Sequence, residues 1–121
     1  MSPLVVVAIG LVGGLGATGR FLLDGAVSER VGRSLPWGTL AVNLTGAFAL
    51  GVLAGATLSE DAYRIAGVGF LGAYTTFSTW MLESHRLAED GRLRPGAINL
   101  IASLVAGVAV AWLGQQVGGA L

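Results

Sequence analysis

The sequence predicts an all-α membrane protein that crosses the bilayer as four helices in a single domain spanning residues 1–121. Three observations carry this prediction. Hydrophobic residues make up 54% of the chain and charged residues only 12%, about half the share of roughly 25% found in soluble proteins. Four stretches carry no charge at all, at 1–19, 34–59, 65–82 and 95–121. With 121 residues, the chain is too short for a second domain beside four such stretches.

Each uncharged stretch is about as long as a membrane crossing requires, since roughly 20 apolar residues span the hydrocarbon core. The expected helices lie at about 3–24, 37–58, 63–84 and 96–118. The first is not expected to be a cleaved signal, because no basic residue precedes Arg20. The second and fourth begin next to Pro36 and Pro95, a residue that favours the first helical turn. Only short loops remain, the longest at 25–36 and 85–95.

The composition also excludes several classes of protein. The chain has no cysteine, which excludes a disulfide framework, a thiolate zinc site and a cysteine nucleophile. It has no lysine and a net charge of zero, so a nucleic-acid partner is not expected. No nucleophile–base pair or metal cluster supports an enzyme. No acidic residue or histidine lies in the middle of a predicted span, which argues against proton-coupled transport.

The arginines predict an orientation. In a four-span topology, six of the seven arginines lie at or near the loops 25–36 and 85–95, and only Arg64 lies on the side of the two termini. Because arginine accumulates on the cytoplasmic side, both termini are predicted to be outside.

Two motif matches carry no function here. Residues 67–72 fit the pattern G-x-G-x-x-G, but a dinucleotide site needs a preceding strand in a soluble βαβ unit. Residues 43–45 match a glycosylation sequon inside a predicted span. Glycine pairs four residues apart, typical of close helix packing in lipid, occur at Gly10 and Gly14, Gly51 and Gly55, and Gly114 and Gly118.

Two polar features lie at membrane depth. Asn43, in the middle of the second span, either forms an interhelical hydrogen bond or donates to an anion in a polar passage. Residues 74–79 include four threonine or serine side chains within the five positions 75–79, shortly after Gly69 and Gly72. This run predicts a locally broken helix, and irregular backbone at this depth is tolerated only inside protein or beside a cavity.

Three segments resemble the CrcB/Fluc fluoride channels: GATGRF at 16–21, WGTLAVNLTG at 37–46 and GFLGAYTTFST at 69–79. The resemblance covers nearly the whole chain, in order and at family spacing. It implies four-helix subunits assembled as antiparallel, dual-topology dimers in the plasma membrane of a prokaryote. It further implies two narrow pores that export fluoride passively from the cytoplasm, lowering fluoride toxicity, and a structural sodium ion at the dimer interface. The implied partners are therefore fluoride, sodium, membrane lipid and a second subunit.

The same resemblance assigns roles to residues. It implies that the backbone carbonyls of Gly72 and Thr75 bind sodium. The implied fluoride-pore residues are Asn43, Phe77, Ser78, Thr79, Trp80 and Ser103, and Arg20 matches the arginine of the first helix. Neutral amide and hydroxyl donors and aromatic ring edges suit an anion that must also leave the pore.

The chain departs from the family pattern at two places. The second aromatic position, usually phenylalanine, is Trp80, whose indole brings bulk and an N–H donor. The polar stripe of the fourth helix is shortened, because Asn99 and Ser103 are followed by Gly107 and Ala111.

These departures and the arginine bias leave three assemblies open. The chain forms a homodimeric channel, or it is the oppositely oriented partner in a heterodimer with a reduced pore. The third possibility is a non-conducting membrane scaffold, which does not explain why Asn43 occurs together with the whole 74–79 run.

Overall fold

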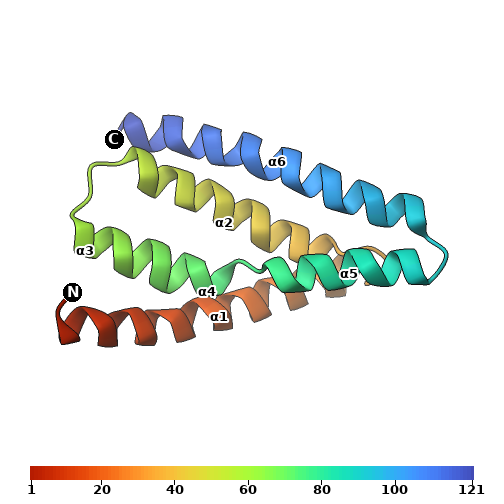
Figure 1. Cartoon of the computed structure of the whole chain (residues 1–121), viewed down its shortest axis with the longest axis horizontal. Helices are drawn as coiled ribbons and strands as arrows, with labels where there is room; N and C mark the ends of the chain where they lie inside the picture. Colours follow the sequence, from red (N-terminus) through yellow and green to blue (C-terminus); the bar gives the residue numbers. More distant parts are fainter.

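The computed structural model describes residues 1–121, and every regular element in it is helical (Figure 1). The elements are α1 (Pro3–Val31), α2 (Trp37–Gly55), α3 (Glu60–Tyr63), the π-helix η1 (Arg64–Leu71), α4 (Gly72–Tyr74), α5 (Phe77–Glu89) and α6 (Leu93–Gly119). The predicted all-α class is confirmed. Three helices, α1, α2 and α6, are each long and apolar enough to cross a membrane.

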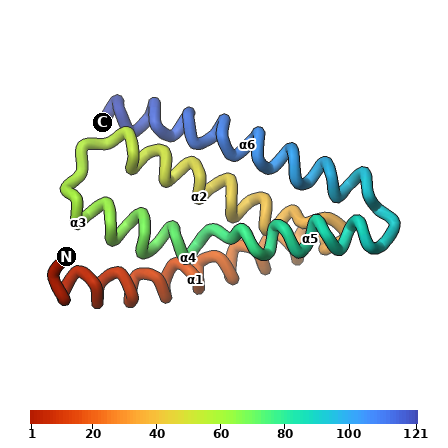
Figure 2. Tube along the Cα trace, in the orientation of Figure 1, coloured from red at the N-terminus to blue at the C-terminus, as the bar shows by residue number.

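The third predicted span, 63–84, was expected to contain a locally broken helix and is not one continuous helix in the structure. It is divided among α3, η1, α4 and α5, and none of these pieces alone has the length of a crossing. The pieces nevertheless follow one another in line beside α1 and α2 (Figure 2). Both termini and the turn before α3 lie at one end of the molecule, and the other two loops lie at the opposite end (Figure 1).

The predicted helix bounds were wrong by several residues because charge marks the membrane boundary rather than the helix end. The first helix was predicted to stop near 24 but continues to Val31 and ends at Gly32, which has a φ of 83°, a conformation that favours glycine. It begins where the Ser2 hydroxyl accepts a hydrogen bond from the Val5 N–H. The second helix ends at Gly55 instead of 58, and the fourth covers 93–119.

Glycines bring α2 and α6 into backbone contact. A Cβ added at Gly51 would lie 2.1 Å from the Ala111 carbonyl oxygen, and one at Gly114 would lie 2.2 Å from that of Phe48. Gly55 and Gly118 are equally close to the facing helix. Two of the three glycine pairs therefore pack the chain against itself, whereas Gly10 and Gly14 face open space.

The helix α1 packs in the same way against η1. A Cβ at Gly16 would lie 2.2 Å from the Phe70 carbonyl oxygen. The π-helix carries i→i+5 bonds, among them the one from the Gly72 N–H to the Gly67 carbonyl. π-helical turns are rare and often lie beside functional sites, and η1 leads directly into such a region.

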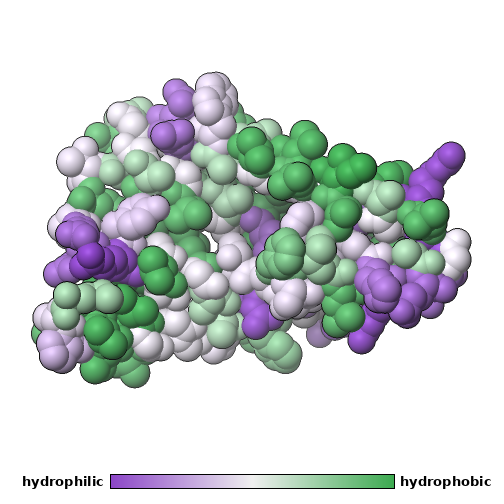
Figure 3. Space-filling view, viewed as in Figure 1, coloured by the Kyte–Doolittle hydropathy of each residue, from purple (hydrophilic) through white to green (hydrophobic).

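Most of the large apolar side chains lie outside the small core. Val42 is the one large side chain that is fully buried, while Leu11, Leu104 and Val108 are among many exposed ones on α1 and α6. Hydrophobic residues cover much of α6 and the N-terminal part of α1, and the largest hydrophilic clusters lie toward the two ends of the molecule (Figure 3). This distribution and the three apolar spans are those of a multi-pass membrane protein.

Candidate functional site

Helical hydrogen bonding stops at Thr75 and Thr76, between α4 and α5 (Figure 2). Both residues are extended, with φ and ψ of −81° and 158° at Thr75 and −145° and 121° at Thr76. Thr76 then caps α5, since its hydroxyl oxygen accepts a hydrogen bond from the Thr79 N–H at 3.3 Å. β-branched residues tolerate extended backbone well, and a threonine hydroxyl is a good helix N-cap.

The side chain of Asn43 holds this interruption from α2. Its Nδ2 donates to the Thr76 carbonyl at 2.9 Å, and its Oδ1 accepts from the Thr76 N–H at 2.8 Å. The amide thus replaces the helical partners that the extended residue has lost. Nδ2 carries two hydrogens, and this pairing uses one of them.

The interruption also leaves the carbonyls of residues 72–75 without their helical donors, and Gly72 and Thr75 are two of these four residues. In an α-helix the Gly72 carbonyl would accept from the Thr76 N–H, which instead bonds Asn43. The Thr75 carbonyl would accept from the Thr79 N–H, which instead bonds the Thr76 hydroxyl. The carbonyls of Gly72 and Thr75 are therefore left for another partner, and a carbonyl oxygen suits a hard cation. No group of three or more His, Asp or Glu side chains is placed to hold a metal.

Small residues and a tyrosine fix the position of this backbone against α2. A Cβ at Gly46 would lie 2.3 Å from Thr75 Cγ2, so only glycine fits there. The Tyr74 hydroxyl is 2.8 Å from the Thr45 hydroxyl, and the Tyr74 ring stacks on Phe70 with centroids 5.8 Å apart. The Thr75 hydroxyl donates back to the Leu71 carbonyl at 3.0 Å.

A cavity of about 450 Å³ opens between α2, the interruption and α6. Six of the nine residues proposed from the sequence line it: Asn43, Gly72, Thr75, Phe77, Trp80 and Ser103. No charged side chain does so. Its polar groups are the amide of Asn43 and the hydroxyls of Thr75, Thr76 and Ser103. The three hydroxyls donate to other residues, so the wall offers one neutral amide donor and several neutral oxygen acceptors.

Two aromatic rings of α5 stand in this wall. The ring centroids of Phe77 and Trp80 are 5.5 Å apart with the planes at 82°, the edge-to-face arrangement that aromatic quadrupoles favour. Phe77 is 69% exposed, so most of its surface is not covered by other residues of the same chain.

The remaining residues proposed from the sequence lie apart from the cavity lining. Ser78 is exposed, and the Thr79 hydroxyl accepts from that of Thr76 at 3.2 Å. Arg20 is half-buried on α1, and its Nε is buried without a hydrogen-bond partner. Ser103, which does line the cavity, donates its hydroxyl hydrogen to Asn99 Oδ1 at 3.4 Å.

Sequence reasoning missed a polar cluster at the arginine-rich end of the helices. A Cβ at Gly38 would overlap Asp24 Oδ1, which accepts from the Ser28 hydroxyl at 3.3 Å. Glu83 Oε1 is buried without a partner. Acidic residues near a predicted span end resemble ordinary loop charges, and only the contact between α1 and α2 shows that Asp24 is enclosed.

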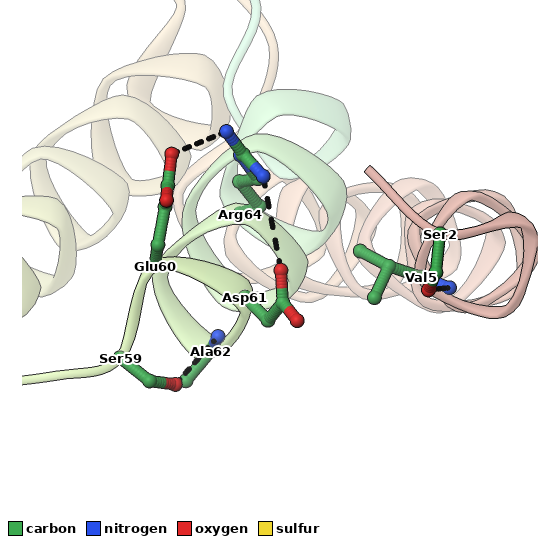
Figure 4. Close-up of polar contacts among 7 residues, drawn as sticks. All are labelled: Ser2, Val5, Ser59, Glu60, Asp61, Ala62 and Arg64. Atoms are coloured by element: carbon green, nitrogen blue, oxygen red, sulfur yellow. Dashed lines mark hydrogen bonds and ion pairs between the residues drawn. The ribbon is translucent and has the colours of Figure 1, made fainter.

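At the opposite end, Arg64 forms ion pairs with Glu60 and with Asp61, the latter at 3.7 Å (Figure 4). Ser59 caps α3 there by accepting from the Ala62 N–H at 3.2 Å. The one arginine on the side of the termini is therefore flanked by two carboxylates.

A family model described as "CrcB-like protein, Camphor Resistance (CrcB)" matches residues 7–115 of this chain. The matched residues include the α2–α5–α6 cavity and the interruption.

Curated relatives are similar over almost the whole chain. A protein of Mycolicibacterium paratuberculosis named "Fluoride-specific ion channel FluC 2" is 53% identical over 112 residues, covering 93% of this chain and 92% of its own. A protein of the same name in Mycobacterium tuberculosis strain H37Rv is 51% identical over 117 residues, covering 97% and 93%. "Fluoride-specific ion channel FluC" of Geobacter metallireducens is 46% identical over 116 residues, covering 92% and 94%.

Proposed function

Because this chain belongs to the CrcB family, whose similar curated members are named as ion channels and not as enzymes, we propose that it is a fluoride-selective channel. It lets fluoride leave the cytoplasm passively through the plasma membrane and thereby lowers fluoride toxicity. The observation that carries this function is the cavity lined by the Asn43 amide and other uncharged groups, placed beside an interruption of the helical backbone.

Fluoride is small and tightly hydrated, so a pore must replace its water with donors of its own. The second hydrogen of Asn43 Nδ2 is one such donor, because the first is bound to the Thr76 carbonyl. The pairing with Thr76 also fixes the amide, so it meets the anion without reorganising. Phe77 supplies a ring edge of positive quadrupole character. The absence of a charged side chain in the lining keeps binding weak enough for rapid exit.

We further propose that residues 60–89 form the third of four crossings, broken at Thr75 and Thr76. Together α3, η1, α4 and α5 cover the length that none covers alone. With four crossings, α6 ends on the same side of the membrane as the N-terminus. The excess of arginine at the opposite ends of the helices supports an outside location for both termini.

The proposed sodium site uses the carbonyls of Gly72 and Thr75. Both have lost their helical donors, which supports the assignment. Bound sodium would neutralise the carbonyl dipoles at the interruption and hold the two halves of the span together. One chain offers only these two carbonyl oxygens, whereas a hard cation is held by several oxygens at once. A second chain related by a two-fold axis would double the set, because such an axis places the same groups opposite each other.

The proposed assembly is therefore an antiparallel dimer of two chains. The exposure of Phe77 and the open face of the cavity support a partner at this surface. If both chains are identical, each must insert in both orientations.

The excess of arginine on one side favours a second candidate, in which this chain is one half of a heterodimer. Six arginines at one end against a single, acid-flanked Arg64 at the other oppose dual insertion. The number 2 in the names of the mycobacterial relatives fits organisms with more than one such chain.

Growth in fluoride tests the function in cells. In a bacterial strain without a fluoride channel, expression of the wild-type chain is expected to restore growth in millimolar fluoride, and the Asn43→Leu variant to leave the strain sensitive. Thr18→Ala is the matched control, because the Thr18 hydroxyl bonds only its own helix, at Gly14. No protection by the membrane-inserted wild-type chain, alone or with an oppositely oriented paralogue, would contradict the proposal.

A further inference from the structure

The polar atoms of Trp80, Ser84 and Asn99 form a closed set of hydrogen bonds between α5 and α6. The Trp80 indole Nε1 donates to the main-chain carbonyl of Asn99 at 3.3 Å. The Asn99 Nδ2 donates to the Ser84 hydroxyl at 2.8 Å, and that hydroxyl donates to the Trp80 carbonyl at 2.9 Å. The three hydrogen bonds therefore form a ring that starts and ends at Trp80.

Two further contacts keep Asn99 in place. Its Oδ1 accepts from the Ser103 hydroxyl at 3.4 Å, so both ends of the amide are in use. Gly96, one turn earlier on α6, brings the two helices together, because a Cβ there would lie 2.8 Å from the Ser84 carbonyl oxygen. Ser84 itself is buried. Water does not compete for these bonds inside a bilayer, so the set holds the indole in one orientation.

The orientation matters because Trp80 lines the cavity beside Phe77. An indole N–H directed at the cavity would be a strong donor to an anion, and hydrogen bonds to ionised groups are about twice as strong as neutral ones. Strong binding at one site slows exit from a pore. The structure directs this N–H to α6 instead of into the cavity.

We infer that Asn99, with Ser84, is a positioning residue that keeps the Trp80 N–H away from the conducted anion, so that the indole acts there as a carbon-edged ring. This inference rests on the proposed function and deepens it. It assigns to Asn99 and Ser84 an influence on fluoride passage without contact with the ion. The main-chain carbonyl of Asn99 accepts the indole N–H, and the bond between the Asn99 and Ser84 side chains joins α6 to α5 at that position.

The first arm of the test compares the Asn99→Leu variant in two backgrounds, so that an effect of the indole N–H is separated from an effect of the ring itself. In the wild-type background the variant removes the side-chain bond that joins α6 to α5 beside the indole, and fluoride efflux from liposomes is expected to change by about tenfold, the factor expected for one hydrogen bond to a charged group. In a Trp80→Phe background no indole N–H remains, so the same substitution is expected to change efflux by less than about threefold. Equal changes in the two backgrounds, in folded variants, would overturn the inference.

The second arm observes the N–H directly by NMR of ¹⁵N-tryptophan-labelled protein. The chain has three tryptophans, and the Trp37→Phe and Trp112→Phe variants assign the indole signals. The Trp80 signal of the wild type is expected to exchange slowly with deuterium and to stay unmoved by added fluoride. In Ser84→Ala and in Asn99→Leu it is expected to exchange faster and to shift with fluoride.

A Trp80 indole that exchanges rapidly or shifts with fluoride in the wild type would overturn the inference, whatever the efflux. Hydrogen exchange does not depend on conduction, so it tests the orientation of the indole even if the wild-type chain transports no fluoride. An absence of fluoride transport would count against the proposed function alone. The exposed indole of Trp37, at the loop end of α2, serves as the internal reference for rapid exchange.

Discussion

The side-chain amide of Asn43 and the backbone of Thr76 form a reciprocal pair of hydrogen bonds, at 2.9 and 2.8 Å, which joins the middle of α2 to the start of α5. The pair does three things at once. It satisfies the extended backbone of Thr76, it orients the second N–H of Asn43, and it removes the helical donor of the Gly72 carbonyl. The first prediction tests this relationship.

Replacing Asn43 with Leu is expected to abolish fluoride efflux and to destabilise the protein by about 2 kcal/mol, because the buried N–H and carbonyl of Thr76 lose their partners. Asn43→Asp keeps an acceptor for the Thr76 N–H but sets a carboxylate against the Thr76 carbonyl, so efflux is expected to be lost as well. Thermal unfolding in detergent and efflux with a fluoride electrode measure the two effects. Efflux from Asn43→Leu equal to that of the Thr18→Ala control would contradict the role of the amide.

Sodium is predicted to stabilise the protein through the carbonyls of Gly72 and Thr75. The melting temperature should be higher in sodium than in N-methylglucamine at equal ionic strength, since a ligand that binds only the folded state raises its stability. Gly72→Ala should keep this difference, because its carbonyl is retained and the added Cβ has no neighbour closer than 3.8 Å.

The same experiment with Asn43→Ala should show a smaller sodium effect. Without the side-chain acceptor, the Thr76 N–H is free to return to the Gly72 carbonyl as in a regular helix. Equal melting temperatures of the wild type in the two cations would argue against the sodium site.

The glycine contact between α2 and α6 is predicted to be sensitive to a single methyl group. Gly51→Ala is expected to destabilise the chain by about 1–3 kcal/mol, the usual cost of overpacking, because its Cβ would overlap the Ala111 carbonyl. Gly25→Ala on α1 is the control, since nothing lies within 4 Å of its Cβ and alanine favours a helix by about 1 kcal/mol. Thermal unfolding of the two variants under the same conditions measures the difference in stability, and equal stability of both variants would contradict the close packing of α2 on α6.

Membrane orientation separates the homodimer from the heterodimer. The chain has no cysteine, so Ser34→Cys and Thr57→Cys each introduce a single thiol, in exposed loops at opposite ends of the helices. For the chain expressed alone, the arginine bias predicts that an impermeant maleimide labels Thr57→Cys in intact cells and leaves Ser34→Cys unlabelled. Comparable labelling of both positions would establish dual insertion and exclude an obligate heterodimer.

The sequence predicted local features of the structure better than contacts between distant segments. The helical class followed from composition, and Asn43 and the 74–79 run drew attention to the place where α2 meets the interruption, because polar groups at membrane depth need partners. The helix ends were wrong, since charges near Arg20 and Asp24 mark the bilayer boundary while the α-helix continues to Gly32.

Contacts between helices could not be predicted from the sequence, because the residue pattern of one helix does not identify the helix that packs against it. The sequence contained the glycine pairs that begin at Gly51 and Gly114, but it did not show that the two pairs bring the same two helices into contact. The extra N–H of Trp80 was visible, but its acceptor at Asn99 was not. The two expected outcomes of Asn43, an interhelical bond and an anion donor, were treated as alternatives, yet its amide has enough hydrogens for both.

Fluoride efflux from liposomes that contain only this purified chain is the most direct measurement of the proposed function, with chloride as the control ion. Rapid loss of fluoride without loss of chloride is the expected result, and it would establish that one chain suffices for a selective pore. No fluoride efflux from folded protein, either alone or after co-expression with an oppositely oriented paralogue, would contradict conduction and leave the chain a structural membrane subunit.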